Sequence, residues 1–126
     1  MSEDIRVLIV EDNKNARATI KNSLSGLNCN FSEAESGEKA LSIIKKKTFD
    51  IIIMDIGLPG IDGIETYRRA KEMTPDLAPV IILTGYLDSG RQKKGKEMGI
   101  YEFLTKDPLP HRKLKECVLQ ATKPGA

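Results

Sequence analysis

The segment DIIIM at residues 50–54, with its uninterrupted isoleucine run, constrains the fold of this chain more than any other feature. A second apolar segment, VIILT, follows at residues 80–84. A strand without a polar face is buried on both sides, which is typical of the centre of a parallel sheet. The two segments therefore predict an α/β fold in which helices cover both faces of the sheet.

Extended and helical patterns alternate along the whole chain. Strands are expected at residues 5–10, 29–34, 50–54, 80–84 and 101–105. Helices are expected from a cap at Asn13 to about Leu27, after a cap at Ser36, at about 63–73, at roughly 89–98 before Gly99, and from Pro110 to about Ala121. This order predicts a doubly wound (βα)5 flavodoxin-like three-layer sandwich with strand order 2-1-3-4-5 and right-handed crossovers.

Length and composition limit the functional classes. The chain of 126 residues is expected to form one domain over residues 1–122, with 123–126 as a frayed tail or the start of a linker. The start MSEDIR lacks the regions of a secretory signal, and no apolar run is long enough to span a membrane. A cytoplasmic location without membrane binding is therefore expected. The net charge of +2 and the absence of Trp argue against direct nucleic-acid binding.

Isolated reactive residues carry little weight. Cys29 and Cys117 lack the spacing of a metal site or a disulfide framework, so both are interpreted as partly buried small apolar residues. His111 is interpreted as a first-turn helix residue. The basic clusters at 45–47 and 91–96 leave two interpretations open, solvated helix faces or a docking surface for an acidic partner.

Acidic residues follow the first and third predicted strands, where each strand ends. Glu11 and Asp12 come after RVLIV, and Asp55 comes after IIIM. Parallel strands bring such ends together at one edge, at the switch point of this strand order. Three carboxylates in one place repel each other, and a cation offsets that repulsion. Carboxylate and carbonyl oxygens suit Mg²⁺, so these three residues and the Gly57 carbonyl are the predicted metal ligands.

Two further polar residues end the fourth and fifth strands, namely Thr84 and Lys106. Asp55 is the candidate nucleophile, because a carboxylate can attack phosphorus to give an acyl phosphate. Lys106 supplies a positive charge and Thr84 a hydroxyl donor for the oxygens of a phosphoryl group. Either residue alone carries almost no information, and only their joint placement predicts phosphoryl transfer.

On these residues the chain resembles the CheY-like receiver domains of two-component response regulators over essentially its whole length. The motifs that carry the resemblance are RVLIVEDN at 6–13, DIIIMDIGLPGIDGIE at 50–65, VIILTG at 80–85 and EFLTK at 102–106. It implies that Asp55 accepts phosphate from a sensor histidine kinase or a histidine phosphotransfer protein. Such a domain catalyses its own phosphorylation and dephosphorylation and does not turn over an external substrate, so it is not expected to be an enzyme.

The resemblance also implies a role for each site residue. Mg²⁺ would be held by Glu11 through water, Asp12, Asp55 and the Gly57 carbonyl, Thr84 and Lys106 would contact the phosphoryl group, and Phe103 would be the rotating switch aromatic. We expect Thr84 to move toward the phosphoryl group and Phe103 to fill the vacated space. The face of the fourth helix, fifth strand and fifth helix would then change and be read by an acidic target, an output domain or a second copy of the chain. That face is expected to carry Lys93, Lys94, Lys96 and Tyr101.

The chain departs from the usual receiver pattern near the site. Asp107 stands between Lys106 and Pro108, where the family has Lys followed directly by a cis Pro. We expect Lys106–Asp107 to be trans and Asp107–Pro108 to be the cis bond, because a cis bond before a residue other than proline is costly. Gly85 replaces the usual Ala. Tyr86 flanks the expected path of the hydrolytic water, and its bulk is predicted to slow dephosphorylation.

Three other functions share this fold or this site chemistry. A flavin-binding protein of this fold would need a phosphate-cradling loop, whereas EDNKN at 11–15 is acidic. A haloacid-dehalogenase-like phosphatase would need a second Asp two residues after Asp55, where Gly57 stands. A phosphorylation-independent interaction module with the receiver fold is the third. The segment TKPGA at 122–126 resembles the start of a linker, so the chain is either a stand-alone receiver or part of a longer regulator.

Overall fold

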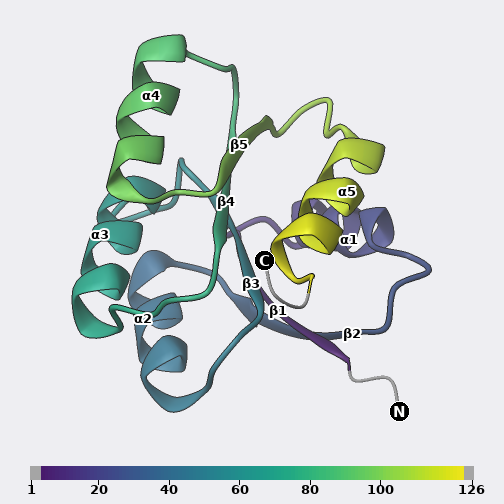
Figure 1. Ribbon diagram of the computed structural model, residues 1–126, viewed down its shortest axis with the longest axis horizontal. Coiled ribbons are helices and arrows are strands. Elements are labelled where there is room, and N and C mark those ends of the chain that lie inside the picture. Colours follow the sequence, from purple (N-terminus) through teal and green to yellow (C-terminus); the bar gives the residue numbers. More distant parts are fainter. Residues whose placement is uncertain (1–3, 124–126) are drawn as a thin grey trace.

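The computed structural model describes residues 4–123 and shows a five-stranded parallel sheet in the order β2-β1-β3-β4-β5 (Figure 1). The predicted strand order is therefore confirmed. The elements in chain order are β1 (Ile5–Val10), α1 (Lys14–Ser23), β2 (Cys29–Ala34), α2 (Gly37–Lys46), β3 (Ile51–Asp55), α3 (Gly63–Met73), β4 (Val80–Thr84), α4 (Ser89–Met98), β5 (Glu102–Thr105) and α5 (His111–Ala121).

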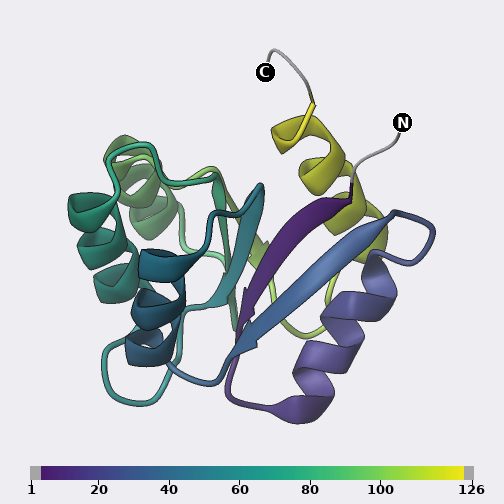
Figure 2. The same cartoon turned by 90° about the horizontal axis from the view of Figure 1, so that it is seen from below.

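The sheet is the middle layer of three. Helices α1 and α5 lie on one side of it, and α2, α3 and α4 lie on the other (Figure 2). Every residue of β3 and β4 is buried, as their apolar sequences predict. Alternate side chains enter two separate cores: Ile53 and Leu83 pack toward α1 and α5, whereas Ile52 and Ile82 pack toward α2 and α3.

Side-chain caps fix where α1, α2 and α3 begin, and Asp88 caps α4 in the same way. Asn13 Oδ1 accepts a hydrogen bond from the Ala16 N–H, Ser36 Oγ from the Lys39 N–H, and Asp62 Oδ1 from the Glu65 N–H. The first two caps were predicted as helix starts, and the third lies in the loop after β3. In all three cases the capping residue is the last residue of the loop that joins a strand to the next helix.

Helix α1 ends at Ser23, so the predicted end near Leu27 is wrong. The chain tightens there, because the N–H groups of Leu24 and Ser25 donate to carbonyls only three residues earlier. Gly26 follows in the left-handed region with φ +95°. Leu24 is nevertheless buried, so the apolar spacing continued into a turn that is no longer α-helical.

β1, β2, β4, α3 and α4 have the predicted bounds, and the other boundaries that differ do so by one residue. β3 begins at Ile51 rather than at residue 50, and β5 begins at Glu102 rather than at 101. Pro110 precedes the first helical residue of α5 instead of occupying it. Asp107–Pro108 is cis, as expected, and it is the one cis bond within residues 4–123. Residues 124–126 of the predicted tail lie outside the described residues.

Candidate functional site

Strand alternation places three charged side chains on one side of the sheet edge. Glu11 continues the alternation of Ile9, and Lys106 continues that of Leu104; both of these apolar residues belong to the core under α1 and α5. Asp55 is in register with Leu83 of the same core. The three groups therefore converge above the α1–α5 side, at the carboxyl ends of β1, β3 and β5.

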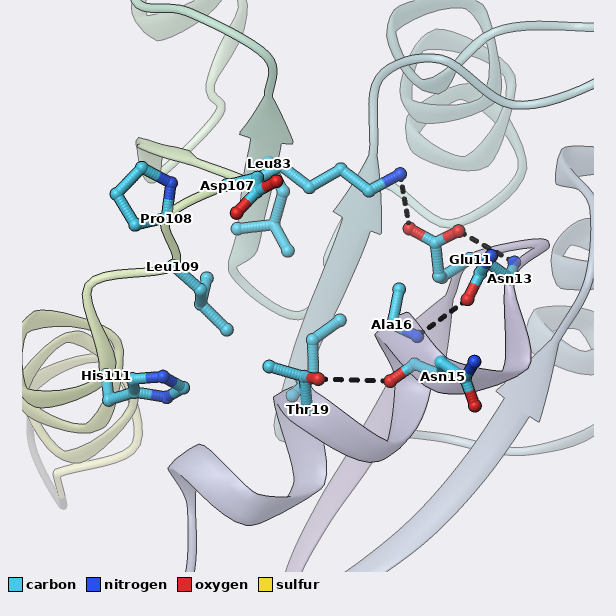
Figure 3. A pocket seen from close by; sticks show the side chains of 12 residues that line it. Glu11, Asn13, Asn15, Ala16, Thr19, Leu83, Asp107, Pro108, Leu109 and His111 are labelled. Carbon is cyan, nitrogen blue, oxygen red and sulfur yellow. Dashed lines mark hydrogen bonds and ion pairs between the residues drawn. The ribbon is translucent and has the colours of Figure 1, made fainter.

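An ammonium joins the two buried carboxylates. Lys106 Nζ lies 2.8 Å from Asp55 Oδ2 and 2.9 Å from Glu11 Oε1. Glu11 is fully buried, and Asp55 is 4% exposed. Backbone N–H groups hold the other oxygens. The Asn13 N–H donates to Glu11 Oε2 at 2.8 Å (Figure 3). The Gly57 N–H donates to Asp55 Oδ1 at 3.1 Å. Asp107 does not prevent Lys106 from entering the predicted site.

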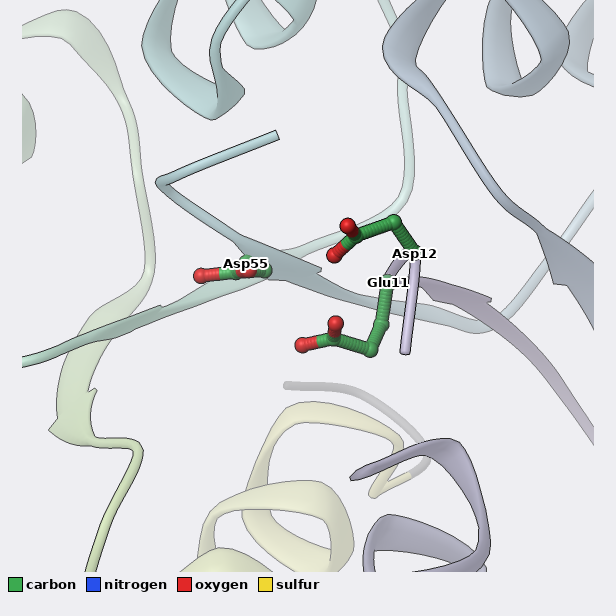
Figure 4. Close-up of side chains that lie close together, drawn as sticks. All are labelled: Glu11, Asp12 and Asp55. Atoms are coloured by element: carbon green, nitrogen blue, oxygen red, sulfur yellow. The ribbon is translucent and has the colours of Figure 1, made fainter. Parts of the chain in front are cut away.

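Asp12 completes a cluster of three carboxylates. Glu11, Asp12 and Asp55 each offer an oxygen within 4.8 Å of the others' oxygens (Figure 4). Burial raises the pKa of Glu11, although Lys106 and the Asn13 N–H oppose this effect. Burial alone would lower the pKa of Lys106, but its bonds with Asp55 and Glu11 raise it above the usual value.

The donor set fits a hard divalent cation. Three carboxylates face one ammonium, so negative charge is in excess. Glu11 Oε1 is buried and accepts no hydrogen bond of good geometry, even with Lys106 nearby. Such an orphaned acceptor is costly unless a ligand satisfies it. The residues that were predicted as the metal-binding carboxylates therefore lie together in a suitable arrangement.

The loop after Asp55 is closed tightly over the strand end. The Gly63 N–H donates to the Ile56 carbonyl at 2.9 Å, and a Cβ at Gly63 would lie only 2.5 Å from the Asp55 carbonyl oxygen. This close approach requires glycine at position 63. It keeps Gly57 beside the carboxylate of Asp55.

Thr84 and Phe103 lie on the other face of the sheet. Ile82 is in register with Phe103 and Thr84 with Thr105, and Phe103 belongs to the core under α2 and α3. The Thr84 hydroxyl donates to the Tyr86 carbonyl at 3.1 Å and does not bond to the carboxylate cluster. Phe103 is 3% exposed, whereas Tyr86 is 74% exposed.

A cleft of about 560 Å³ extends from the charged cluster along α1 to the start of α5 (Figure 3). Its apolar walls include Ile20 and Leu109, and its polar walls include Thr19 and His111. His111 is the first residue of α5, as predicted, and its Nδ1 contacts Ser23 Oγ of α1. The sequence did not predict this cleft, because only the approach of α1 to the turn before α5 creates it.

Comparisons with known proteins agree on one family. Residues 7–118 match the family described as the response regulator receiver domain. The phosphate regulon transcriptional regulatory protein PhoB of Pseudomonas aeruginosa is 36% identical over 94% of this chain and 53% of its own length. The chain spans between 15% and 53% of the curated relatives that head this comparison.

Solved structures give the same result. The receiver domain of the Francisella response regulator 1452 has a TM-score of 0.87 and 26% identity over 98% of this chain and all of that chain. The BeF3-activated DrrB receiver domain has a TM-score of 0.81 and 27% identity over 94% of this chain and 97% of that one. Within residues 4–123, no helix is both long enough and apolar enough to cross a membrane.

Proposed function

The chain belongs to the response regulator receiver domain family, and from this premise we propose that it accepts a phosphoryl group on Asp55. The donor would be a sensor histidine kinase or a histidine phosphotransfer protein, and the reaction would depend on Mg²⁺. The observation that carries the proposal is the buried cluster in which Lys106 Nζ lies 2.8 Å from Asp55 Oδ2. We propose residues 1–122 as the domain and the cytoplasm as its location.

Asp55 is proposed as the nucleophile. One of its oxygens would form the new P–O bond while the P–N bond to the donor histidine breaks, and the imidazole would leave with the electron pair. The Gly57 N–H and the Lys106 ammonium already hold this carboxylate in place. Positioning and charge stabilisation are the main contributions a protein makes to such a transfer.

The metal would be held by Glu11 through water, by Asp12 and Asp55, and by the Gly57 carbonyl. When bound, Mg²⁺ would neutralise charge on the transferred phosphoryl oxygens. Lys106 would move part of its interaction from the carboxylates to a phosphoryl oxygen. The same groups would support hydrolysis of the acyl phosphate, so the domain would catalyse its own phosphorylation and dephosphorylation and not turn over an external substrate.

Thr84 is proposed to report the phosphoryl group to the rest of the domain. Its hydroxyl would leave the Tyr86 carbonyl and donate to a phosphoryl oxygen. A hydrogen bond to a charged group contributes about 1.5–3 kcal/mol. Reversing a 1:99 population needs about 5.5 kcal/mol, so Thr84 would need the help of Lys106 to complete the switch.

The output is proposed to be the α4–β5–α5 face, read by a target, an output domain or a second copy. Lys96 lies on this face and pairs with Glu102 of β5 at 2.9 Å, and Tyr101 is 41% exposed. Lys94 instead lines a hollow of about 300 Å³ with Ile64 of α3. The basic residues of α4 are thus divided between two faces, which the sequence did not predict.

The test is the intact mass of the chain after incubation with acetyl phosphate, with and without Mg²⁺. We expect a Mg²⁺-dependent phosphoryl adduct in the wild type and in Asp76→Ala, an exposed acidic control, and no adduct in Asp55→Ala. An unmodified wild type that still binds Mg²⁺ would overturn the proposal in favour of a phosphorylation-independent interaction module.

A further inference from the structure

Gly95 is the one buried residue of α4. A Cβ built on Gly95 would lie 2.6 Å from Phe103 Cε1 and closer still to Cζ. Real Cβ atoms do not approach ring carbons so closely, because the van der Waals radii overlap. The Phe103 ring therefore occupies the space that any side chain at position 95 would need.

Few other contacts hold α4 in place. Four of its ten residues are Arg or Lys, two are glycines, and only Gln92 and Met98 are half-buried besides Gly95. Glycine is a poor helix former, so its presence mid-helix asks for a reason. At Gly90 a Cβ would meet only Asp88 Oδ1, at an ordinary 3.5 Å. Of the two helical glycines, Gly95 alone is required by packing.

In this structure the Phe103 ring packs against Gly95 while the Thr84 hydroxyl points away from the carboxylate cluster. Thr84 donates to the Tyr86 carbonyl in the same structure in which Phe103 rests against Gly95. Phe103 of β5 is in register with Ile82 of β4, two residues before Thr84, so Phe103 and Thr84 lie on the same face of the sheet. In the proposed switch, the ring would leave Gly95 toward the space beside Thr84 once that side chain turns to a phosphoryl oxygen.

We propose that Gly95 is a positioning residue for the switch: its missing side chain forms a seat that holds Phe103 in the resting state and couples α4 to the phosphorylation site. This inference rests on the proposed function of Asp55. A methyl group on the seat would disfavour the resting state. Because linkage is reciprocal, the same substitution would tighten binding of a phosphoryl analogue.

The experiment compares Gly95→Ala with the matched control Gly90→Ala on the same helix. The probe is beryllofluoride in saturating Mg²⁺, titrated by NMR. We expect Gly95→Ala to bind beryllofluoride at least about fivefold more tightly than the wild type does. A factor of about five is the lower end of common allosteric coupling effects. The Phe103 ring resonances should shift in the unliganded protein. Gly90→Ala should change neither the affinity nor these resonances.

A double-mutant cycle separates the seat from general loosening of the domain. In the Phe103→Leu background, adding Gly95→Ala should leave the beryllofluoride affinity unchanged, since no ring remains to overlap. If Gly95→Ala alone fails to fold and the double variant folds, the overlap is supported. If both fail to fold while Phe103→Leu folds, the ring is not the cause and the proposal is overturned.

Unchanged or weaker beryllofluoride binding by folded Gly95→Ala would also overturn the proposal, as would an equal gain in Gly90→Ala. Failure of the proposed function has a different signature, because neither wild type nor any variant would then bind beryllofluoride or take up phosphate. In that case the proposed coupling of α4 to the phosphorylation site would be wrong too. Unshifted Phe103 ring resonances in Gly95→Ala would also contradict the proposed packing of the ring against Gly95.

Discussion

At the scale of single residues, Lys106 offsets part of the negative charge of the acidic site. Its ammonium contacts Glu11 and Asp55, and both carboxylates are almost fully buried. The sequence predicted Lys106 in the site from its position after the fifth strand. It did not predict that one ammonium would bridge both carboxylates, because that depends on distances across three strands. Lys106 and a bound cation would thus offset the same repulsion.

Replacing Lys106 by Met should therefore destabilise the domain most when Mg²⁺ is absent. Without the metal, we expect a loss of about 1.5–3 kcal/mol in the free energy of unfolding, the usual value for charged hydrogen bonds. With saturating Mg²⁺ the loss should shrink, since the cation compensates the carboxylates. Urea unfolding measures both, and exposed Lys93→Met is the control. An equal loss under both conditions would show that the two cations act independently.

Asp50 gives a pH-dependent contribution away from the site. Two-point hydrogen bonding by Arg6, with Nε at 3.2 Å and Nη2 at 3.0 Å, lowers the pKa of Asp50 below the ordinary 3.8. A carboxyl whose folded pKa is lowered stabilises the fold above its unfolded pKa. That stability is lost as the pH falls through the folded value.

Asp50→Asn should accordingly cost about 1 kcal/mol near neutral pH, at the upper end for a surface pair. The difference from wild type should stay constant down to about pH 5 and shrink below pH 4, where the wild-type carboxyl becomes protonated. Chemical unfolding at several pH values measures this difference. A difference that persists at pH 2 would mean that side-chain shape, and not charge, stabilises this position.

At the scale of elements, the sequence predicted most element bounds but not the end of α1 or the side-chain rotamers. β2 and β4 have the predicted bounds, because their ends are marked by turn residues and by the polar residue that follows. The end of α1 was wrong since Leu24 and Leu27 kept the apolar spacing while the backbone had already tightened. Thr84 ends β4 as predicted, but its hydrogen bond to the Tyr86 carbonyl depends on a rotamer that no sequence periodicity encodes.

Tyr86 connects the β4–α4 loop to the lifetime of the acyl phosphate. Its carbonyl accepts the Thr84 hydrogen bond, and Tyr86 is 74% exposed. We predict that Tyr86→Ala loses phosphate several-fold faster, because a smaller side chain leaves the hydrolytic water a wider path. Loss of the mass adduct over time measures the rate. Exposed Tyr101→Ala should lose phosphate at the wild-type rate, and no acceleration in Tyr86→Ala would refute the role.

At the scale of the whole molecule, the site exists only because three strands end together. The order β2-β1-β3-β4-β5 puts β1 beside β3, so Glu11, Asp12 and Asp55 meet although they are far apart in sequence. This convergence was predictable from the apolar runs and from the rule that such sheets bind ligands at the switch point. The seat at Gly95 was not, because it depends on how far α4 approaches β5.

A cation that joins the ends of β1 and β3 should stabilise the whole domain, because unfolding separates its ligands. For a ligand at a concentration 100 times its dissociation constant, this linkage amounts to about 2.7 kcal/mol. For a domain of this size, that free energy corresponds to a rise in Tm of roughly 5–15 °C. Thermal unfolding across a Mg²⁺ titration at constant ionic strength measures it.

Asp12→Asn should lose most of this rise, since Asp12 is exposed and its carboxylate has little role in the fold without metal. Asp76→Asn, an equally exposed acidic residue outside the cluster, should keep the full rise. Equal stabilisation of both variants would mean that Mg²⁺ acts on general surface charge. A rise confined to proteins with an intact carboxylate cluster would instead link the metal to cooperative folding of the sheet, because its ligands come from two strands that unfold together.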